Sequence, residues 1–273
     1  MTDVPLLEIP EPYDFAVSTE RFRAFGPDYA NLWHEGGLHR VVGGREVRIE
    51  EAPGGVLVEP LDAEIEAEVG TLLGLPFDLD AFYRWARRAD PVVRRIASAL
   101  AGFRPPLAPS PFESLVTSIS AQQVSLFAAF AIRNRLIERY GGRGEHAFSF
   151  PTREGLAAAD EDELFSLGFS RRKAEYVVGL ARSDLDLDAL AGLPDDEVKA
   201  RITAVRGLGE WTADWFLARH LARPHAWAPG DLGVRKAIAA FYGDEDSHDV
   251  VERFDPFQNL TVHYLLTGAR VLG

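Results

Sequence analysis

Two glycines one residue apart interrupt a helical pattern, and this break constrains the fold more than any other feature of the sequence. Residues 194–205, PDDEVKARITAV, carry apolar side chains at helical spacing. Gly207 and Gly209 then end the helix, because glycine adopts the positive φ that a tight reversal needs. Residues 209–222, GEWTADWFLARHLA, begin a second helix at once. The sequence therefore predicts a helical hairpin at this point.

This hairpin has two interpretations. One is an ordinary pair of packed helices, which is sufficient to explain a single G-x-G. The other is a helix-hairpin-helix, in which the backbone N–H groups of Gly207 and Gly209 bind a DNA phosphate at the positive end of the second helix. The carboxylate of Glu210, directly beside those amides, opposes phosphate binding.

The composition argues against DNA and excludes several kinds of metal centre. The net charge is −13, with 26 Arg but only three Lys, and phosphate repels an acidic protein at long range. The absence of cysteine excludes disulfides, a cysteine nucleophile, thiolate zinc sites and an iron–sulfur cluster. The seven histidines are scattered without an H-E-x-x-H motif, so we expect no catalytic transition metal. Without a membrane-spanning apolar run or a signal peptide, the expected location is the cytoplasm.

The pattern along the chain predicts an α+β fold, with a small N-terminal antiparallel sheet followed by an all-helical body. Residues 38–60 form three short alternating runs separated by Gly43-Gly44 and Pro53-Gly54-Gly55, which are hairpin-type turns. From about residue 63 the apolar spacing becomes helical. The predicted helices are 63–74, 78–88, 90–102, 112–120, 124–140, 161–167, 170–182, 194–205, 210–222, 231–242 and 257–270.

Three residues in or just after the hairpin, Trp211, Trp215 and Asp231, stand at positions that suit either a structural or a functional role. Trp211 and Trp215 share one face of the second hairpin helix, where they are either core residues or the walls of a slot for a flat base. Asp231 follows Pro229-Gly230 and precedes a helical run, so we predict that it is an N-cap, with Arg235 at i+4 as an ion-pair partner. By themselves these features indicate only structure.

Four segments taken together resemble the helix-hairpin-helix DNA glycosylase superfamily, and most closely its 3-methyladenine DNA glycosylase II family. They are SPFESLVTSISAQQVSLFAAFAIRNRLIERYG (110–141), LFSLGFSRRKAEYVVGLA (164–181), AVRGLGEWTADWF (204–216) and APGDLG (228–233), in this order and at these spacings. The resemblance covers residues 110–240, and more faintly PEPYDFAVSTERF and the N-terminal sheet. It implies base excision repair, in which alkylated bases are flipped out of duplex DNA and released by hydrolysis of the N-glycosidic bond.

The resemblance assigns Asp231 as the catalytic carboxylate, because the deoxyribose becomes positively charged as the base leaves. Relatives that also cut the strand carry a lysine in the second hairpin helix, where this sequence has Trp211, and Lys236 is five residues beyond Asp231. We therefore expect a monofunctional glycosylase without lyase activity. Two alternatives stay open: a glycosylase of the same fold for oxidised or deaminated bases, and a damaged-DNA-binding module without catalysis.

The resemblance also places the remaining site residues. The wedge that fills the vacated base stack falls on Gln122 and Gln123, whose alternative is a pair of solvated loop residues, and Gln123 takes a position that is often apolar in relatives. The base pocket is assigned to Trp211 and Trp215, and to Leu266, where some relatives have an aromatic residue. Tyr13 and Phe15 from the N-terminal domain are also assigned to the pocket, and the alternative for these two is the sheet core. Phosphate contacts fall on Gly207, Gly209 and the basic run Arg171, Arg172 and Lys173, whose alternative is a solvated helix face.

Hairpins of this family commonly bind a monovalent cation through main-chain oxygens. The corresponding carbonyl groups are those of Thr203, Val205 and Leu208, so a Na⁺ or K⁺ ion is possible there, and no other cofactor is expected. The expected partner is duplex DNA carrying a damaged base, bound by a monomer. No membrane contact is expected.

By resemblance the helical body has two lobes. The predicted units are an N-terminal sheet domain at 1–88, a helical domain at 111–227 that contains the hairpin at 194–222, and a second lobe in which 89–110 joins 228–273. Asp231 is expected in the cleft between the lobes.

Overall fold

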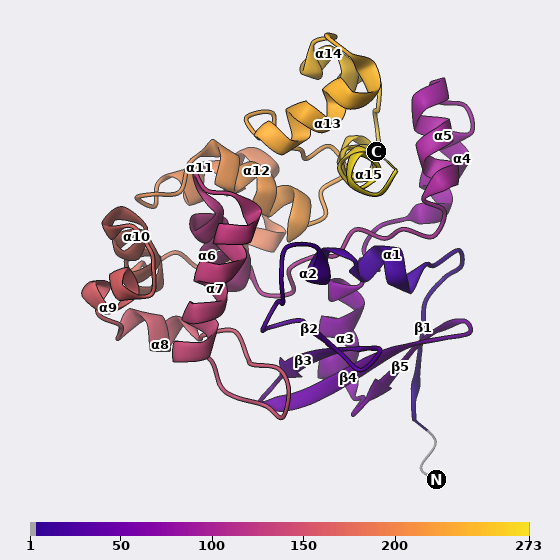
Figure 1. Cartoon of the computed structure of the whole chain (residues 1–273). Coiled ribbons are helices and arrows are strands. Elements are labelled where there is room, and N and C mark those ends of the chain that lie inside the picture. Colours follow the sequence, from indigo (N-terminus) through magenta and orange to yellow (C-terminus); the bar gives the residue numbers. More distant parts are fainter. Residues whose placement is uncertain (1–3, 273) are drawn as a thin grey trace.

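The computed structural model describes residues 4–272, and its N-terminal part is a small antiparallel sheet (Figure 1). The strands pair in the order β1-β5-β4-β3-β2, and their bounds are β1 Leu6–Glu8, β2 Leu32–His34, β3 Gly37–Val42, β4 Arg45–Ala52 and β5 Gly55–Glu59. Gly43 and Gly44 have φ values of 55° and 76°, as a two-residue hairpin turn between β3 and β4 requires. The three predicted strands are β3 to β5, and β1 and β2 extend the sheet at its two edges.

Helices make up the rest of the chain and confirm the predicted α+β class. Two short helices precede β2, namely α1 (Phe15–Thr19) and α2 (Arg21–Ala24). The helices after the sheet are α3 Ala63–Leu72, α4 Leu79–Ala86, α5 Pro91–Ala99, α6 Pro111–Ala121, α7 Leu126–Tyr140, α8 Arg153–Ala157, α9 Glu161–Ser166, α10 Arg171–Arg182, the 3₁₀ helix η1 Asp188–Gly192, α11 Asp195–Thr203, α12 Glu210–Arg219, α13 Leu232–Tyr242, α14 Ser247–Glu252 and α15 Gln258–Val271. None of these helices, within residues 4–272, is both long enough and apolar enough to cross a membrane.

The sequence analysis missed the shortest helices. The helices α1, α2, α8 and α14 have four to six residues each, which is too short for the 3.6-residue period to repeat visibly. Their ends carry the local signal instead: Asp14, Thr152 and Asp246 each accept a backbone N–H as side-chain N-caps.

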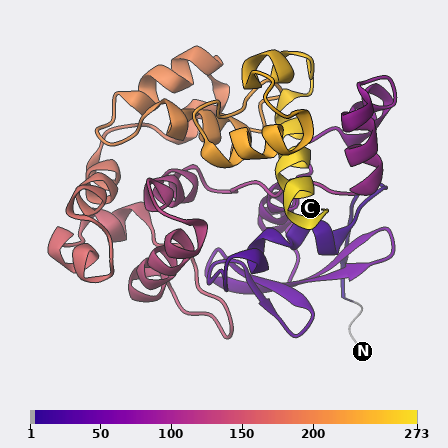
Figure 2. The ribbon, with the colours of Figure 1, turned by 45° about the horizontal axis from the view of Figure 1, so that its top comes forward.

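The buried apolar residues form two clusters. One lies between the sheet and the helices α1 to α3, and it includes Val47, Ile49 and Leu73. The other fills the helical body and already includes Phe82 on α4, whose ring contacts Tyr264 at a centroid distance of 4.8 Å. The core of the sheet unit therefore ends before α4. The division into 1–88 and two helical lobes stays a prediction, and residues 1–3 and 273 lie outside the described part of the chain. In Figure 2 the sheet lies on one side and α15, in yellow, extends from the helical side toward it.

A buried ion-pair network joins the sheet unit to the helical body. Arg40 on β3 donates to Glu113 on α6 (2.7 Å) and to Glu68 on α3 (2.6 Å). Arg133 on α7 donates to the other oxygen of Glu113 (2.7 Å) and to Asp28 before β2 (2.5 Å). The side chains of Arg40, Glu113, Arg133 and Asp28 are each only 5% exposed. Paired charges of this kind fix the relative position of the elements that carry them.

Candidate active site

Asp231 is an N-cap, as predicted, and its position is fixed by the start of α13. Its Oδ1 accepts the backbone N–H of Val234 at 3.0 Å. Arg235 donates its backbone N–H to the Asp231 carbonyl at 3.0 Å. Within residues 4–272 the expected ion pair between the Asp231 and Arg235 side chains does not form. The cap therefore holds one carboxylate oxygen against the backbone and leaves the other for side-chain donors.

Two indole N–H groups bind that second oxygen. Trp211 and Trp215 on α12 donate from Nε1 to Asp231 Oδ2 at 2.9 and 3.0 Å. Trp215 is 4% exposed and Trp211 is partly buried, so both serve the core as well as the site. The four-residue spacing places both donors on the same face of α12, where they lock the carboxylate in one orientation.

The Asp231 carboxylate is ionised over the physiological pH range. Burial by itself favours the protonated form and raises the pKa. The N–H groups of Val234, Trp211 and Trp215 and the positive charge of Arg219 outweigh that effect, so the pKa of Asp231 lies below its ordinary value of 3.8. A carboxylate has about four acceptor positions, and three are used by these donors. One acceptor position remains for a water or a developing positive charge.

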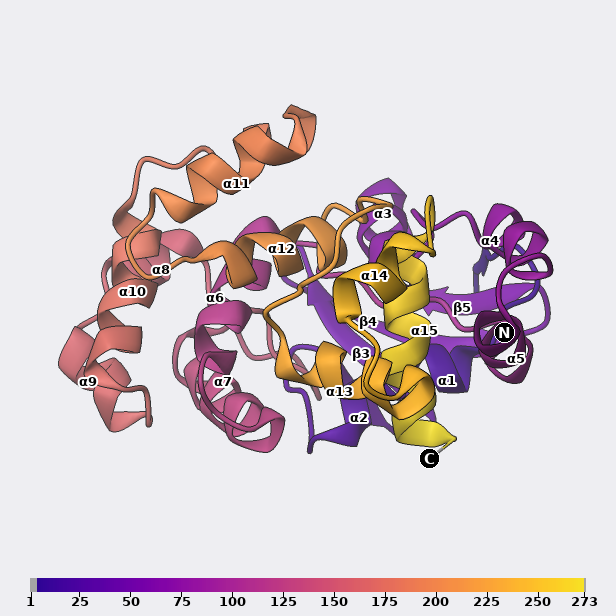
Figure 3. The same ribbon diagram turned by 90° about the horizontal axis from the view of Figure 1, so that it is seen from above.

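Asp231 lines a cavity of about 1040 Å³, whose other walls come mainly from α2, α6, α7, α12 and α15. Figure 3 shows α13 beside α15, while α12 lies apart from them, next to α6. The predicted site residues that line this cavity are Trp211, Trp215, Asp231, Leu266, Gln122, Gln123 and Gly209. Its volume is at the upper end of the range for ligand pockets, so a nucleobase with its sugar fits inside it without filling it.

Arginines that the sequence analysis did not single out line the same cavity. Arg219 lies with its guanidinium 3.6 Å from the centre of the Trp215 ring, and its Nε–H donates to Nε2 of His263 at 3.4 Å. Arg21 on α2 has no hydrogen-bond or ion-pair partner for its side chain within residues 4–272. Burial and the positive charge of Arg270 lower the pKa of Arg21 to about 10. Burial and the charge of Arg21 likewise lower the pKa of Arg219.

Comparison with known proteins gives the family. Residues 116–256, more than half of the chain, match the model of the HhH-GPD superfamily of base excision DNA repair proteins. The chain belongs to this superfamily.

Relatives and solved structures agree with this membership. The DNA-3-methyladenine glycosylase of Bacillus subtilis (strain 168) is 28% identical over 183 residues, which are 64% of this chain and 60% of that protein. The DNA-3-methyladenine glycosylase 2 of Escherichia coli (strain K12) is 30% identical over 184 residues, 66% of this chain and 63% of that protein. The matched region thus spans less than two thirds of either relative. The 3-methyladenine DNA-glycosylase from Archaeoglobus fulgidus matches with a TM-score of 0.87 at 25% identity, covering 97% of this chain and 98% of that one.

The HhH-GPD hairpin consists of α11 and α12, and Gly207 is essential to its shape. Gly207 has a φ of 90°, and a Cβ atom there would lie 2.1 Å from the ring of Tyr176. Gly209 is the N-cap residue of α12, with a φ of −104° and open space around it. One glycine is required by both conformation and packing, whereas the other leaves the amides of the helix start accessible.

We expect Gly207→Ala to destabilise the protein by about 2–3 kcal/mol, because left-handed backbone strain adds to an overlap with Tyr176. Gly209→Ala is the matched control, with an expected cost of about 1 kcal/mol or less for a poorer N-cap. Urea unfolding of both variants measures the difference. Equal losses for the two would show that the close contact with Tyr176 does not constrain the hairpin.

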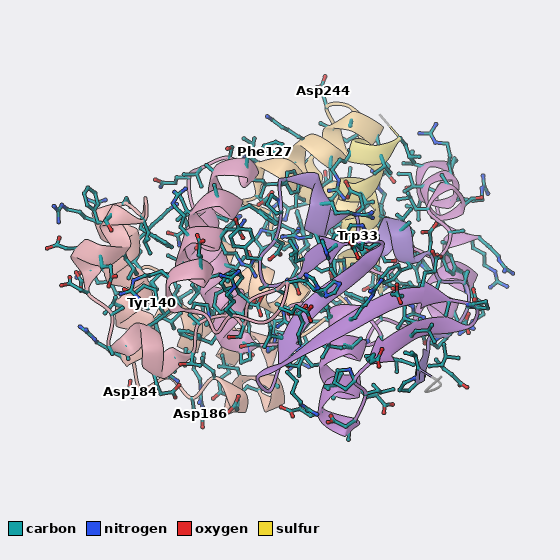
Figure 4. All side chains as sticks on the ribbon, turned by 60° about the horizontal axis from the view of Figure 1, so that its bottom comes forward. Trp33, Phe127, Tyr140, Asp184, Asp186 and Asp244 are labelled. Carbon is teal, nitrogen blue, oxygen red and sulfur yellow. The ribbon has the colours of Figure 1, made fainter. Side chains whose placement is uncertain are left out.

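The loop after α6 contacts the hairpin directly. Nε2 of Gln122 donates to the Gly207 carbonyl at 2.9 Å, so this side chain supports the turn. Gln123 has a φ of 55°, which a non-glycine residue rarely adopts. The apolar side chains that follow are unusually exposed, up to 64% for Phe127, which is labelled in Figure 4. Gln123 at the rim of the cavity stays the predicted wedge.

Three of the predicted assignments differ from the structure. Tyr13 and Phe15 do not line the cavity. Phe15 is 1% exposed, and its ring centroid lies 5.7 Å from that of Trp33. Phe15, on α1, belongs to the buried core of the sheet unit, and Tyr13, just before α1, is partly buried against that core. Lys173 is 8% exposed and donates to the Ser120 carbonyl at 2.9 Å, so it faces the interior instead of a phosphate. Its pKa is lowered by burial.

The other members of the basic run are at the surface. Arg171 pairs with Asp162 at 2.9 Å and lies over the ring of Phe165, and Arg172 is exposed. Phosphate contacts from these two arginines stay predictions. At the hairpin, the Val205 carbonyl accepts the N–H of Leu208 at 3.1 Å. The cation assigned to the carbonyl groups of Thr203, Val205 and Leu208 stays a prediction too.

Proposed function

We propose that this HhH-GPD protein is a monofunctional DNA glycosylase that releases alkylated bases from duplex DNA by hydrolysis. The observation that carries the proposal is the ionised Asp231 carboxylate, held by two indole N–H groups in a cavity that is large enough for a nucleobase. The named activities of the relatives support the reaction, and the description of the superfamily supports DNA as the partner. We further propose that the enzyme acts as a cytoplasmic monomer without an added cofactor.

The proposed chemistry rests on charge. As the glycosidic bond breaks, the electron pair leaves with the base and the deoxyribose becomes a positively charged oxocarbenium ion. A carboxylate about 4 Å away, at an effective dielectric of about 20, stabilises that charge by about 4 kcal/mol, which is on the order of a thousandfold in rate. Water then adds to the sugar carbon and loses a proton. The fixed orientation of Asp231 means that little reorganisation accompanies this step.

Hydrolysis without strand cutting is proposed because the lyase position is occupied by an indole. Trp211 takes the place where lyase-active relatives have lysine. Lys236 on α13 also lines the cavity, but it is exposed at the rim. The proposal therefore predicts no covalent enzyme–DNA adduct on borohydride reduction.

A second candidate function is the release of deaminated or oxidised bases. The observation in its favour is the positive charge of Arg21 and Arg219 in the cavity of Asp231. Cationic alkylated purines are repelled by these guanidinium groups, whereas a neutral base with carbonyl oxygens accepts their hydrogen bonds. Hypoxanthine is the simplest base of that kind.

We expect the wild-type protein to release free base from a duplex of methylated purines and leave the strand intact. The same assay with a hypoxanthine duplex tests the second candidate. Arg21→Gln should reduce hypoxanthine release about tenfold, the value of one charged hydrogen bond, without reducing methylated-base release. Arg23→Gln on the same helix is the control, because Arg23 lies over Trp33 and does not line the cavity.

The outcomes separate the candidates. Faster release of hypoxanthine, dependent on Arg21, would replace the first proposal with the second. Binding to lesion-containing duplex without release of any base would indicate a damaged-DNA-binding module.

A further inference from the structure

Side chains of α12 and α15 meet at the indole ring of Trp215. The guanidinium of Arg219, one turn after Trp215 on α12, lies 3.6 Å from the centre of that ring. His263 on α15 packs edge-to-face with the same ring, with centroids 5.9 Å apart and planes at 73°. The Nε–H group of Arg219 donates to Nε2 of His263 at 3.4 Å. These three side chains form one contact group, and the indole N–H of Trp215 joins it to Asp231.

His263 is a neutral hydrogen-bond acceptor in this group. It is 6% exposed, and burial together with the positive charge of Arg219 lowers its pKa to about 3. Its Nδ1 faces the main-chain carbonyl of Asn259 at 2.9 Å, so the proton of the neutral ring is on Nδ1. Nε2 therefore presents its lone pair to Arg219 throughout the physiological pH range.

The start of α15 is fastened to the end of α12, and this fixes His263. Asn259 is 1% exposed and donates from Nδ2 to the carbonyl groups of Ala218 and Arg223 at 3.0 and 2.8 Å. These carbonyl groups belong to the last turn of α12 and to the segment that follows it. The acceptor for Arg219 is therefore tied to the same helix that carries Arg219.

Arg219 affects the charge of Asp231 without binding it. Both residues line the cavity, and the positive charge of Arg219 lowers the pKa of Asp231. In the described part of the chain their side chains nevertheless form no ion pair. A guanidinium on a flexible side chain binds carboxylates readily. If it turned onto Asp231, it would occupy the acceptor position that the sugar cation or the water needs.

We propose that His263 is a positioning residue, which holds Arg219 on the ring of Trp215 and so prevents an ion pair with Asp231. This inference rests on the proposed function, because it concerns the carboxylate that stabilises the sugar cation. His263 itself does not line the cavity, so it acts through Arg219. The change it controls is in bond breaking and not in DNA binding.

Single-turnover base release and DNA affinity of His263→Phe, measured on a duplex of methylated purines, test the proposal. Phenylalanine keeps a ring but offers no acceptor. We expect release about tenfold slower, the value of one hydrogen bond to a charged group, and an affinity within about twofold of the wild type. His263→Gln restores an acceptor oxygen and should stay within about threefold of the wild-type rate.

His220→Phe is the matched control for the loss of a buried imidazole on the same helix. Nδ1 of His220 also contacts a main-chain carbonyl, that of Ala108, at 2.7 Å. Its ring does not line the cavity, so this variant should release base at the wild-type rate. An equal loss of rate in His220→Phe and His263→Phe would overturn the positioning role.

A double variant shows whether His263 acts through Arg219. If the released guanidinium blocks Asp231, then adding Arg219→Met to His263→Phe should restore much of the rate of base release, because no guanidinium remains. A crystal structure of His263→Phe should show Arg219 within hydrogen-bond distance of Asp231. A merely structural role of His263 predicts the opposite, namely a further loss of rate in the double variant.

The outcomes keep this inference separate from the proposed function. Additive losses in the double variant, or Arg219 still lying on Trp215 in the structure of His263→Phe, would overturn the positioning role. A DNA affinity that falls as much as the rate would overturn it too. A wild type that releases no base would contradict the proposed function instead, and the crystal structure would still decide where His263 holds Arg219.

Discussion

Asp231→Asn should release alkylated base at least about a thousandfold more slowly than the wild type, while binding lesion-containing duplex with similar affinity. The asparagine has the shape of the aspartate but no charge to stabilise the oxocarbenium ion, and that stabilisation accounts for about 4 kcal/mol. Single-turnover base release and DNA binding, measured on the same preparations, check the two parts. Base release within tenfold of the wild type would remove Asp231 from the chemistry.

The structure adds a cost to this variant that must be separated from catalysis. Asp231 accepts on both oxygens, from Val234 at one and from Trp211 and Trp215 at the other. An asparagine has one acceptor oxygen, so either the cap or the indole pair faces an NH₂ group. We therefore expect a loss of about 1–2 kcal/mol in stability as well. Asp246→Asn, at the N-cap of α14, controls for capping alone and should leave base release unchanged.

How much of the site could be predicted from the sequence depends on how far apart along the chain the contacting residues are. Asp231 could be identified from the sequence because its signals are local: a proline-glycine turn, a cap position and a motif. Arg219 could have been found, since Trp211, Trp215 and Arg219 recur every four residues along one helix face. Lys173 was misassigned to a phosphate contact because a run of three basic residues suggests that all three lie at the surface. The helix nevertheless turns its third member inward beside Ala174 and Val177, which are buried.

Contacts between distant segments could not be predicted from one sequence. The indole hydrogen bonds to Asp231 depend on how α12 and α13 pack, and no spacing encodes that packing. The stacking of His146 on His34 likewise depends on a loop that returns to the sheet. Tyr13 and Phe15 show the same limit. Their distance from the hairpin along the chain leaves both the pocket and the sheet core open, and in the structure this segment packs against the sheet core. The α+β order, in contrast, follows from periodicity alone and was predicted.

The buried network at the junction should make Glu113→Gln one of the most destabilising single changes in this chain. Burial favours protonation of Glu113, but Arg40 and Arg133 outweigh it and hold the pKa of this carboxyl below its ordinary value. The ionised group accepts a hydrogen bond from each arginine. Glutamine presents an oxygen to one arginine and an NH₂ group to the other, so two buried donors face each other. Breaking a buried ion pair in this way costs about 3–5 kcal/mol.

Urea and thermal unfolding of Glu113→Gln measure this loss, which should lower the Tm by roughly 10 °C. Glu163→Gln is the matched control: Glu163 also holds two partners, Arg139 and Tyr140, but at the surface, where such a contact is worth about 1 kcal/mol or less. Similar losses for the two variants would show that the network adds no more than a surface contact. Because Glu113 and Arg133 also line the cavity of Asp231, a large loss would mean that one ion-pair network both joins the sheet to the helices and shapes the proposed site.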